Sequence, residues 1–306
     1  MSNEFTQIRK NLSNFPDPVK DNFEDAYNVL INRLSNENLY KWAEIGLDIS
    51  SKSVRSWESS VEYFKSSPSV QRQLPAGQFL RWGRTGNNLC ADSPHIGSAF
   101  FKHSPQTLLR LRPRYIDDWA HICRSLYRGT WKSSSLSVKI FESTPEILET
   151  LNFEEFYKFV EFLGVLSNRS YDQANEALEK SIEIFPLISK EIKIFLDTIK
   201  TVSERSWKFS IPLLISVENL VSNNLLDERA YLIKISKDAF MSNNIDPSTV
   251  IETGITTFSK VEIQNRDQLI DMSETISRLF PDSLIVFLNS VSILLEKITF
   301  EQITKW

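Results

Sequence analysis

The residues best suited to metal or nucleophile chemistry gather in one short section of the chain. Thiols and imidazoles are ligands that zinc prefers, and a thiol beside an imidazole can also act as a nucleophile. Their spacing matches neither a zinc-finger pattern nor the H-E-x-x-H pattern of zinc proteases. The sequence therefore favours structural roles for them, and leaves open whether they converge on a metal. These residues are Cys90, His95, His103, His121 and Cys123.

Other catalytic patterns are missing from the sequence. Phosphate-binding loops need closely spaced glycines, yet neither G-x-G-x-x-G nor G-x-x-x-x-G-K occurs. A G-x-S-x-G nucleophile elbow is also missing. The carboxylate pair Asp117 and Asp118 precedes Trp119 at an expected helix start, where acids favour the positive end of the helix dipole. We expect a protein that is not an enzyme, with no catalytic, cofactor-binding or metal-binding residues.

The strongest candidate for function is a cationic section in an otherwise acidic chain. Residues 65–139 contain twelve lysines and arginines against three acids, whereas the whole chain has a net charge of −4. The planar guanidinium of arginine suits carboxylate and phosphate partners, so an acidic protein surface is the expected partner. Nucleic acid is the alternative, and a third possibility is that the arginines pair with acids of the same chain. The candidate partner-binding residues are Arg81, Arg84, Arg110, Arg112, Arg114, Arg124 and Arg128.

An internal repeat defines the elements that must position these arginines. The pattern Phe-Lys-Ser-Ser-Pro at 64–68 recurs as Phe-Lys-His-Ser-Pro at 101–105 and as Phe-Glu-Ser-Thr-Pro at 141–145. Its prolines lie 37 and then 40 residues apart, and a Phe-Pro pair follows at 185–186. A period of about 37–41 residues is typical of armadillo and HEAT repeats, in which each unit packs only against its neighbours.

A tryptophan ladder predicts how the repeats pack. Each tryptophan of this ladder is followed four residues later by a small residue, so both lie on one helical face and a neighbouring helix can approach closely. We expect these indoles to lie in the core rather than to stack on a ligand. The three pairs are Trp42 with Gly46, Trp82 with Gly86, and Trp119 with Cys123.

Each repeat is expected to contain three helices. The first carries the ladder tryptophan, at about 39–52, 78–91 and 115–128. The second begins near an aromatic position and ends at the Phe of the repeated pattern. The Ser-Pro or Thr-Pro step then predicts a stop and a short third helix, because Ser and Thr cap helices and proline suits their first turn. The aromatic positions are Trp57, Trp131, Tyr171 and Trp207.

These patterns predict an all-α fold, an α-solenoid of about seven armadillo- or HEAT-like repeats. Residues 1–38 should form an N-terminal helical cap with a helix start at Asp17 and Pro18. The array should span 39–306, with its best-matched repeats at 39–151 and more divergent ones at 152–306. We expect a cytoplasmic protein without a membrane partner, because no signal-peptide core and no spanning apolar stretch occur.

Part of the repeat resembles a known family. Trp42-Ala43-Glu44-Ile45-Gly46, with Ser-Trp at 56–57, Tyr-Phe at 63–64 and Ser-Pro at 67–68, is similar to the helical repeat region beside von Willebrand factor A domains in NorD/CoxE-like proteins. The A domain itself and its metal motif are missing here. The resemblance implies an adaptor that works with a MoxR-type AAA+ ATPase in metalloenzyme maturation. The leading hypothesis is a non-catalytic scaffold for an acidic protein partner, such as an AAA+ ATPase or its client. The alternative is a nucleic-acid-binding repeat protein that uses residues 65–139.

Overall fold

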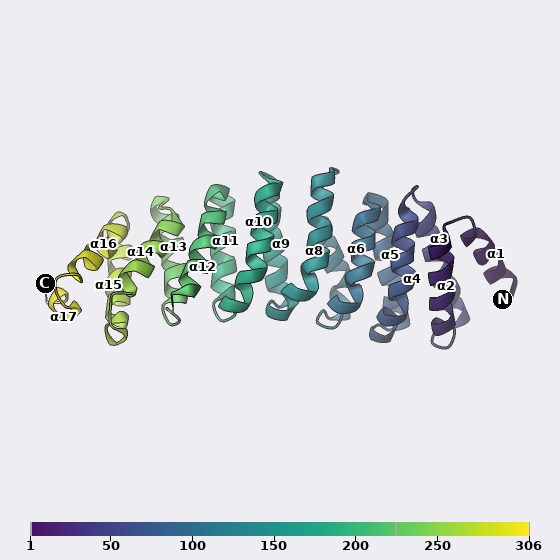
Figure 1. Cartoon of the computed structure of the whole chain (residues 1–306), viewed down its shortest axis with the longest axis horizontal. Helices are drawn as coiled ribbons and strands as arrows, with labels where there is room; N and C mark the ends of the chain where they lie inside the picture. The colour runs from purple at the N-terminus through teal and green to yellow at the C-terminus, as the bar shows by residue number, and fades with distance from the viewer. Residues whose placement is uncertain (1, 224, 306) are drawn as a thin grey trace. The chain divides into compact units, whose positions relative to one another are not determined.

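The computed structural model describes residues 2–223 and 225–305, with side chains from residue 5 onward. Every regular element among these residues is a helix, and within each of the two units named below neighbouring helices pack in sequence order (Figure 1). This confirms the predicted all-α helical repeat fold. In the described part of the chain, no helix is both long enough and apolar enough to span a membrane. The contacts divide the chain into unit 1 (Met1–Val160) and unit 2 (Glu161–Trp306).

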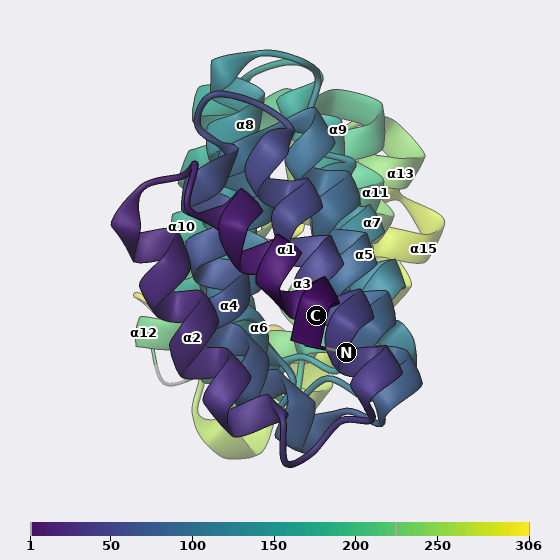
Figure 2. The ribbon, with the colours of Figure 1, turned by 90° about the vertical axis from the view of Figure 1, so that its right-hand side faces the viewer.

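Unit 1 is built from helix pairs arranged in two rows. The even-numbered helices α2, α4, α6 and α8 pack one against the next, and α1, α3, α5 and α7 form the second row (Figure 2). Each repeat thus contributes one helix to each row. The helices are α1 (Ser2–Leu12), α2 (Asp17–Leu30), α3 (Asn36–Ser51), α4 (Ser56–Gln73), α5 (Ala76–Asp92), α6 (Pro94–Thr107), the 3-10 turn η1 (Pro113–Tyr115), α7 (Ile116–Arg124), α8 (Trp131–Thr150) and α9 (Phe153–Ser167), which continues into unit 2.

Unit 2 repeats the same arrangement. Helices α10, α12, α14 and α16 pack in succession, and so do α11, α13 and α15. The helices are α10 (Tyr171–Ile184), η2 (Phe185–Ile188), α11 (Ile192–Ser206), η3 (Trp207–Phe209), α12 (Ser210–Ser222), α13 (Arg229–Asn243), α14 (Pro247–Phe258), η4 (Ile263–Asn265), α15 (Arg266–Leu279), η5 (Pro281–Ser283), α16 (Leu284–Leu294) and α17 (Phe300–Ile303).

Most helix starts agree with the sequence patterns. Helix α2 begins at Asp17, followed by proline, while α8 and α10 begin at the aromatic positions Trp131 and Tyr171. The first helices of the repeats also match, since α3, α5 and α7 contain Trp42, Trp82 and Trp119. The aromatic ladder therefore located the turn that separates the two helices of a repeat.

The predicted third helix is wrong in unit 1. Helices α4, α6 and α8 continue without interruption through Pro68, Pro105 and Pro145. Each repeat is therefore a helix pair, as in HEAT repeats, rather than a three-helix armadillo unit. A proline inside a helix lacks one N–H donor and typically costs about 3 kcal/mol. The conformational preference of proline would break these helices, so contacts with other helices must stabilise them.

The residue before each proline supplies such a contact, because it bridges the two helices of its repeat. Ser67 Oγ donates to the carbonyl of Tyr63 at 2.6 Å and accepts the indole N–H of Trp42 at 2.9 Å. In the next repeat Ser104 accepts from Trp82 at 2.8 Å, and the following repeat uses Trp119 and Thr144 at 3.2 Å. These hydroxyls are interhelical acceptors rather than the predicted helix caps.

The prediction that the ladder tryptophans pack in the core is confirmed. The indoles of Trp42, Trp82 and Trp119 are fully buried. A Cβ added to Gly46 would lie 2.1 Å from the ring of Phe64, and one added to Gly86 would lie 2.2 Å from the ring of Phe101. The glycines are therefore required because an aromatic ring of the partner helix lies directly over their backbone.

Candidate functional site

The thiols and imidazoles of residues 90–123 do not form one cluster in the structure. Cys90 and Cys123 are buried, and burial raises the pKa of the Cys90 thiol to about 12 and that of Cys123 well above its usual value. His95 and His121 are exposed, while burial and nearby Lys102 lower the pKa of half-buried His103. Across the residues that the structure describes, no three His, Cys, Asp or Glu side chains lie together as a metal site. Both thiols are buried in the core and form no disulfide.

Two of the seven candidate arginines pair with acids across the groove between α5 and α7. The guanidinium of Arg81 forms an ion pair with Asp117, which also accepts a hydrogen bond from Thr85 at 2.7 Å. At the other end of the groove, Arg124 Nη2 donates to Asp92 at 2.8 Å. Each pair joins α5 to α7, so these two arginines link neighbouring repeats within unit 1.

The turn between α6 and α7, residues 108–115, carries three more candidates. Arg110 pairs with Glu149 at 2.6 Å, and the Arg114 guanidinium lies over the Tyr115 ring, 4.6 Å from its centroid. The side chain of Arg112 is exposed and forms no hydrogen bond or ion pair within the described residues. Leu109 belongs to the same turn and has 70% of its surface exposed. The turn therefore presents one apolar side chain among three cations.

The two remaining candidates lie away from this turn. Arg84 is exposed on α5, while Arg128 is exposed in the turn between α7 and α8. Next to Arg128, Trp131 has 77% of its surface exposed, and Lys132 Nζ lies 6.0 Å from the Trp131 ring centroid. The seven candidates therefore lie on α5, in the turn before α7, at the last residue of α7 and in the turn after it.

Two exposed apolar residues were missed by sequence reasoning. Leu109 follows another leucine, and only the fold shows that Leu108 is buried while Leu109 is exposed. Trp131 belongs to the aromatic ladder that was interpreted as a marker of helix starts. It is the first residue of α8, and only the structure shows that its ring is exposed.

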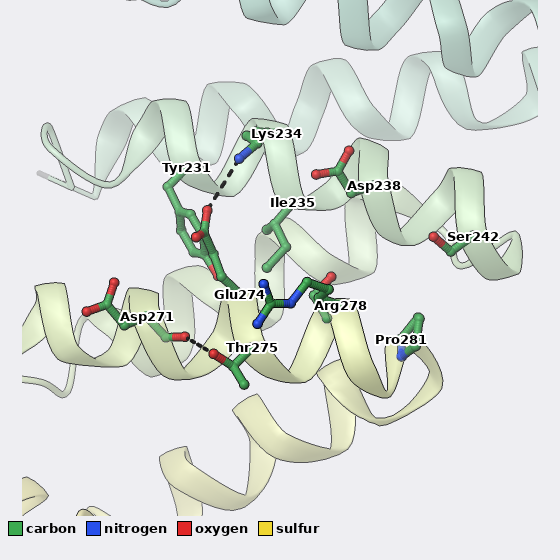
Figure 3. A pocket seen from close by; sticks show the side chains of 11 residues that line it. Tyr231, Lys234, Ile235, Asp238, Ser242, Asp271, Glu274, Thr275, Arg278 and Pro281 are labelled. Atoms are coloured by element: carbon green, nitrogen blue, oxygen red, sulfur yellow. Dashed lines mark hydrogen bonds and ion pairs between the residues drawn. The ribbon is translucent and has the colours of Figure 1, made fainter.

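Unit 2 contains a different feature, an open groove of about 610 Å³ between α13 and α15 (Figure 3). Lys234 and Glu274 pair across it at 3.3 Å, while Asp238, Asp271 and Arg278 add further charges along its walls. The Tyr231 ring lines the groove, and burial raises the pKa of its phenol. Charges of both signs are interspersed, so the groove has no clear preference for an anion or a cation.

Comparison of the chain with protein-family models, curated proteins and solved structures gives no significant match.

Proposed function

We propose that the protein is a non-catalytic interaction scaffold whose α6–α7 turn receives an acidic protein partner. The observation that supports this most is the composition of the turn, where exposed Leu109 lies among Arg110, Arg112 and Arg114. An exposed apolar residue in the same turn as three arginines has the composition of a protein-binding surface, with an apolar centre and a charged rim. A partner segment with an apolar side chain flanked by acids would match it.

The intramolecular ion pairs reduce the number of arginines whose charge can serve a partner. Arg81 and Arg124 already neutralise acids of neighbouring helices, and Arg110 does so with Glu149. Arg112 and Arg114 form no ion pair in the described part of the chain, so their charges are available to a partner. We therefore assign the recognition to these two arginines together with Leu109. An AAA+ ATPase or one of its client proteins, as the resemblance implies, is the first partner class to test.

The experiment compares capture of partners by variants with equal charge change. The variant Arg112→Glu/Arg114→Glu alters the turn, while Lys10→Glu/Lys20→Glu changes exposed lysines of α1 and α2 by the same charge. Bait protein is incubated with nuclease-treated native lysate at low and high salt. We expect a defined protein partner whose recovery falls about tenfold or more in the arginine variant only. Equal recovery by both variants would contradict the proposal.

Leu109→Ser provides a test that leaves every charge in place. A protein partner that uses the apolar centre should lose affinity, because a side chain of this size contributes about 1–3 kcal/mol when fully buried. Binding to phosphates alone should be unaffected. The measurement is recovery of the same partner under the same conditions.

Nucleic-acid binding is the second candidate, and a different observation favours it. Exposed Trp131 lies between Arg128 and Lys132, and an exposed aromatic ring beside cations can stack on a base of a single strand. This candidate predicts binding of a labelled single-stranded oligonucleotide that weakens steeply with salt. Trp131→Ala should reduce that binding, whereas Arg112→Glu/Arg114→Glu at the opposite end of α7 should reduce it less.

A further inference from the structure

A groove of about 340 Å³ lies between the α6–α7 turn and the start of α9, within unit 1. A long turn here adjoins a short one, because residues 108–115 join α6 to α7 whereas only Leu151 and Asn152 join α8 to α9. Arg110 of the long turn pairs with Glu149 of α8 at 2.6 Å, so the two sides of the groove are linked. The groove therefore belongs to the same turn that carries three of the candidate arginines.

Buried residues make the floor of this groove apolar. Leu111, Leu148 and Leu151 line it and are almost inaccessible to solvent. The half-buried rings of Tyr115 and Phe153 also line it, and they stack on each other with their centroids 4.5 Å apart. Ligand pockets begin at about 300 Å³, so the groove has room for one large side chain rather than for a folded surface. An aromatic or large aliphatic side chain fits such a lining.

The two sides of the groove carry opposite charges that do not pair with each other. Arg112 lines it from the long turn, and Glu154 lines it from the first turn of α9. Both residues are exposed, and neither side chain forms an ion pair among the described residues. Arg110 also lines the groove, but Glu149 already neutralises its charge. A segment that occupies the groove would therefore meet a cation on one side and an anion on the other.

We propose that this groove is the anchor pocket for the partner of the α6–α7 turn, and that the part of the partner it binds is a linear peptide segment. The segment inserts one aromatic or large aliphatic side chain against the leucines, with an acid beside Arg112 and a base beside Glu154. The charges of the segment and the groove are then complementary on both sides. This inference rests on the proposed function, because Arg112 belongs to both contacts. It specifies that the acidic partner also supplies an apolar anchor and a base.

Two labelled synthetic peptides test the pocket by fluorescence anisotropy with the full chain at low salt. The first peptide, Glu-Asp-Glu-Phe-Ser-Lys-Lys, carries the anchor between acids and bases, and the second has serine in place of phenylalanine. We expect the first peptide to bind about tenfold or more tightly, because only its ring can be buried against the leucines. Equal affinities, or no binding of either peptide at up to about 300 µM protein, would overturn the proposal.

Reversal of the charge on α9 tests the order of charges across the groove. Glu154→Lys should weaken the first peptide about tenfold and strengthen, about threefold or more, a third peptide in which glycines replace the two lysines. A loss of structure would weaken both peptides, so it cannot produce these opposite shifts. Glu146→Lys on α8 is the matched control, because Glu146 is exposed and does not line the groove. A Glu154→Lys variant that weakens both peptides equally, or changes neither, would overturn the proposal.

Recovery of the protein partner from lysate, measured with the same variants, separates this inference from the proposed function. We expect Glu154→Lys to reduce recovery about tenfold, as Arg112→Glu/Arg114→Glu does. If only the arginine variant reduces recovery, the scaffold function stands and the anchor pocket is refuted. If the peptides bind as expected while neither variant changes recovery, the groove is a peptide site and the function proposed for the turn is refuted.

Discussion

Two prolines at equivalent places of the repeat behave differently in the two units. In unit 1, Pro105 lies inside α6, while in unit 2 the α-helix α10 ends at Ile184 and Pro186 lies in a 3-10 turn. The residue before the proline differs as well. Ser104 accepts a hydrogen bond from Trp82 of the partner helix, whereas Phe185 has no such hydroxyl. An interhelical hydrogen bond can therefore keep a helix continuous at a proline that would otherwise end it.

The two units also use different interactions to stabilise the packing of neighbouring helices. Unit 1 buries the indoles of Trp42, Trp82 and Trp119 against hydroxyls and glycines. Unit 2 relies more on aliphatic residues and uses a buried ion pair, in which Arg266 Nη1 lies 3.2 Å from Glu228 Oε1 and links α15 to the residue before α13. The two units should therefore respond to different substitutions.

The largest effect is expected for Arg266→Met in unit 2. This change leaves the carboxylate of Glu228, whose side chain is only 5% exposed, without its counter-charge. Breaking a buried pair on one side typically costs about 3–5 kcal/mol. Urea unfolding followed by far-UV circular dichroism should detect a lower midpoint, while thiol labelling of Cys90 and Cys123 reports on unit 1 separately. A loss of stability confined to unit 1 would contradict the comparison.

Gly86→Ala should have the next largest effect, now in unit 1. The new Cβ would meet Phe101 at 2.2 Å and Phe100 at 2.9 Å, and both rings are fully buried. Overpacking of this kind costs about 1–3 kcal/mol. Gly77→Ala is the control, because nothing lies within 4 Å of its added Cβ. The midpoint of urea-dependent thiol labelling should fall for Gly86→Ala only.

Ser104→Ala tests the hydrogen bond that accompanies the internal proline. Removal of the hydroxyl leaves the buried indole N–H of Trp82 without its acceptor, which should cost about 1–2 kcal/mol. Ser135→Ala, at an exposed position of α8, should change stability little. The urea midpoint of each variant is compared with that of the wild type, and it should fall for Ser104→Ala only. Equal stability would mean that packing alone holds α6 through Pro105.

The smallest effect is expected for Lys200→Met in unit 2. Lys200 pairs with Glu161 at 2.7 Å, and the pKa of Lys200 is raised chiefly by that hydrogen bond. A partly exposed pair contributes about 0.5 kcal/mol. Because the folded pKa is raised, the contribution is complete below the unfolded value of 10.5 and is lost as pH rises through the folded pKa. The stability difference between variant and wild type should therefore vanish at strongly alkaline pH.

Sequence reasoning located the helices better than it located their ends or the binding surface. The period and the tryptophan ladder predicted which helices contain Trp42, Trp82 and Trp119, because burial against a neighbour imposes a regular spacing. The arginines were predicted as one section of the chain, yet the fold distributes them over α5, the turn before α7, the last residue of α7 and the turn after it. Ion pairs such as Arg81 with Asp117 join residues 36 positions apart, which only the repeat-to-repeat register brings together.

The sequence by itself determined the fold class and the helices that contain the ladder tryptophans, because the spacing of apolar, aromatic and small residues reflects the face that each helix must bury. Only the tertiary structure decided that α4, α6 and α8 pass through their prolines, since the stabilising contacts come from another helix. The tertiary structure also decided which apolar side chains are exposed. Leu109 and Val286 look like core residues in the sequence, and the packing of their neighbours leaves them on the surface.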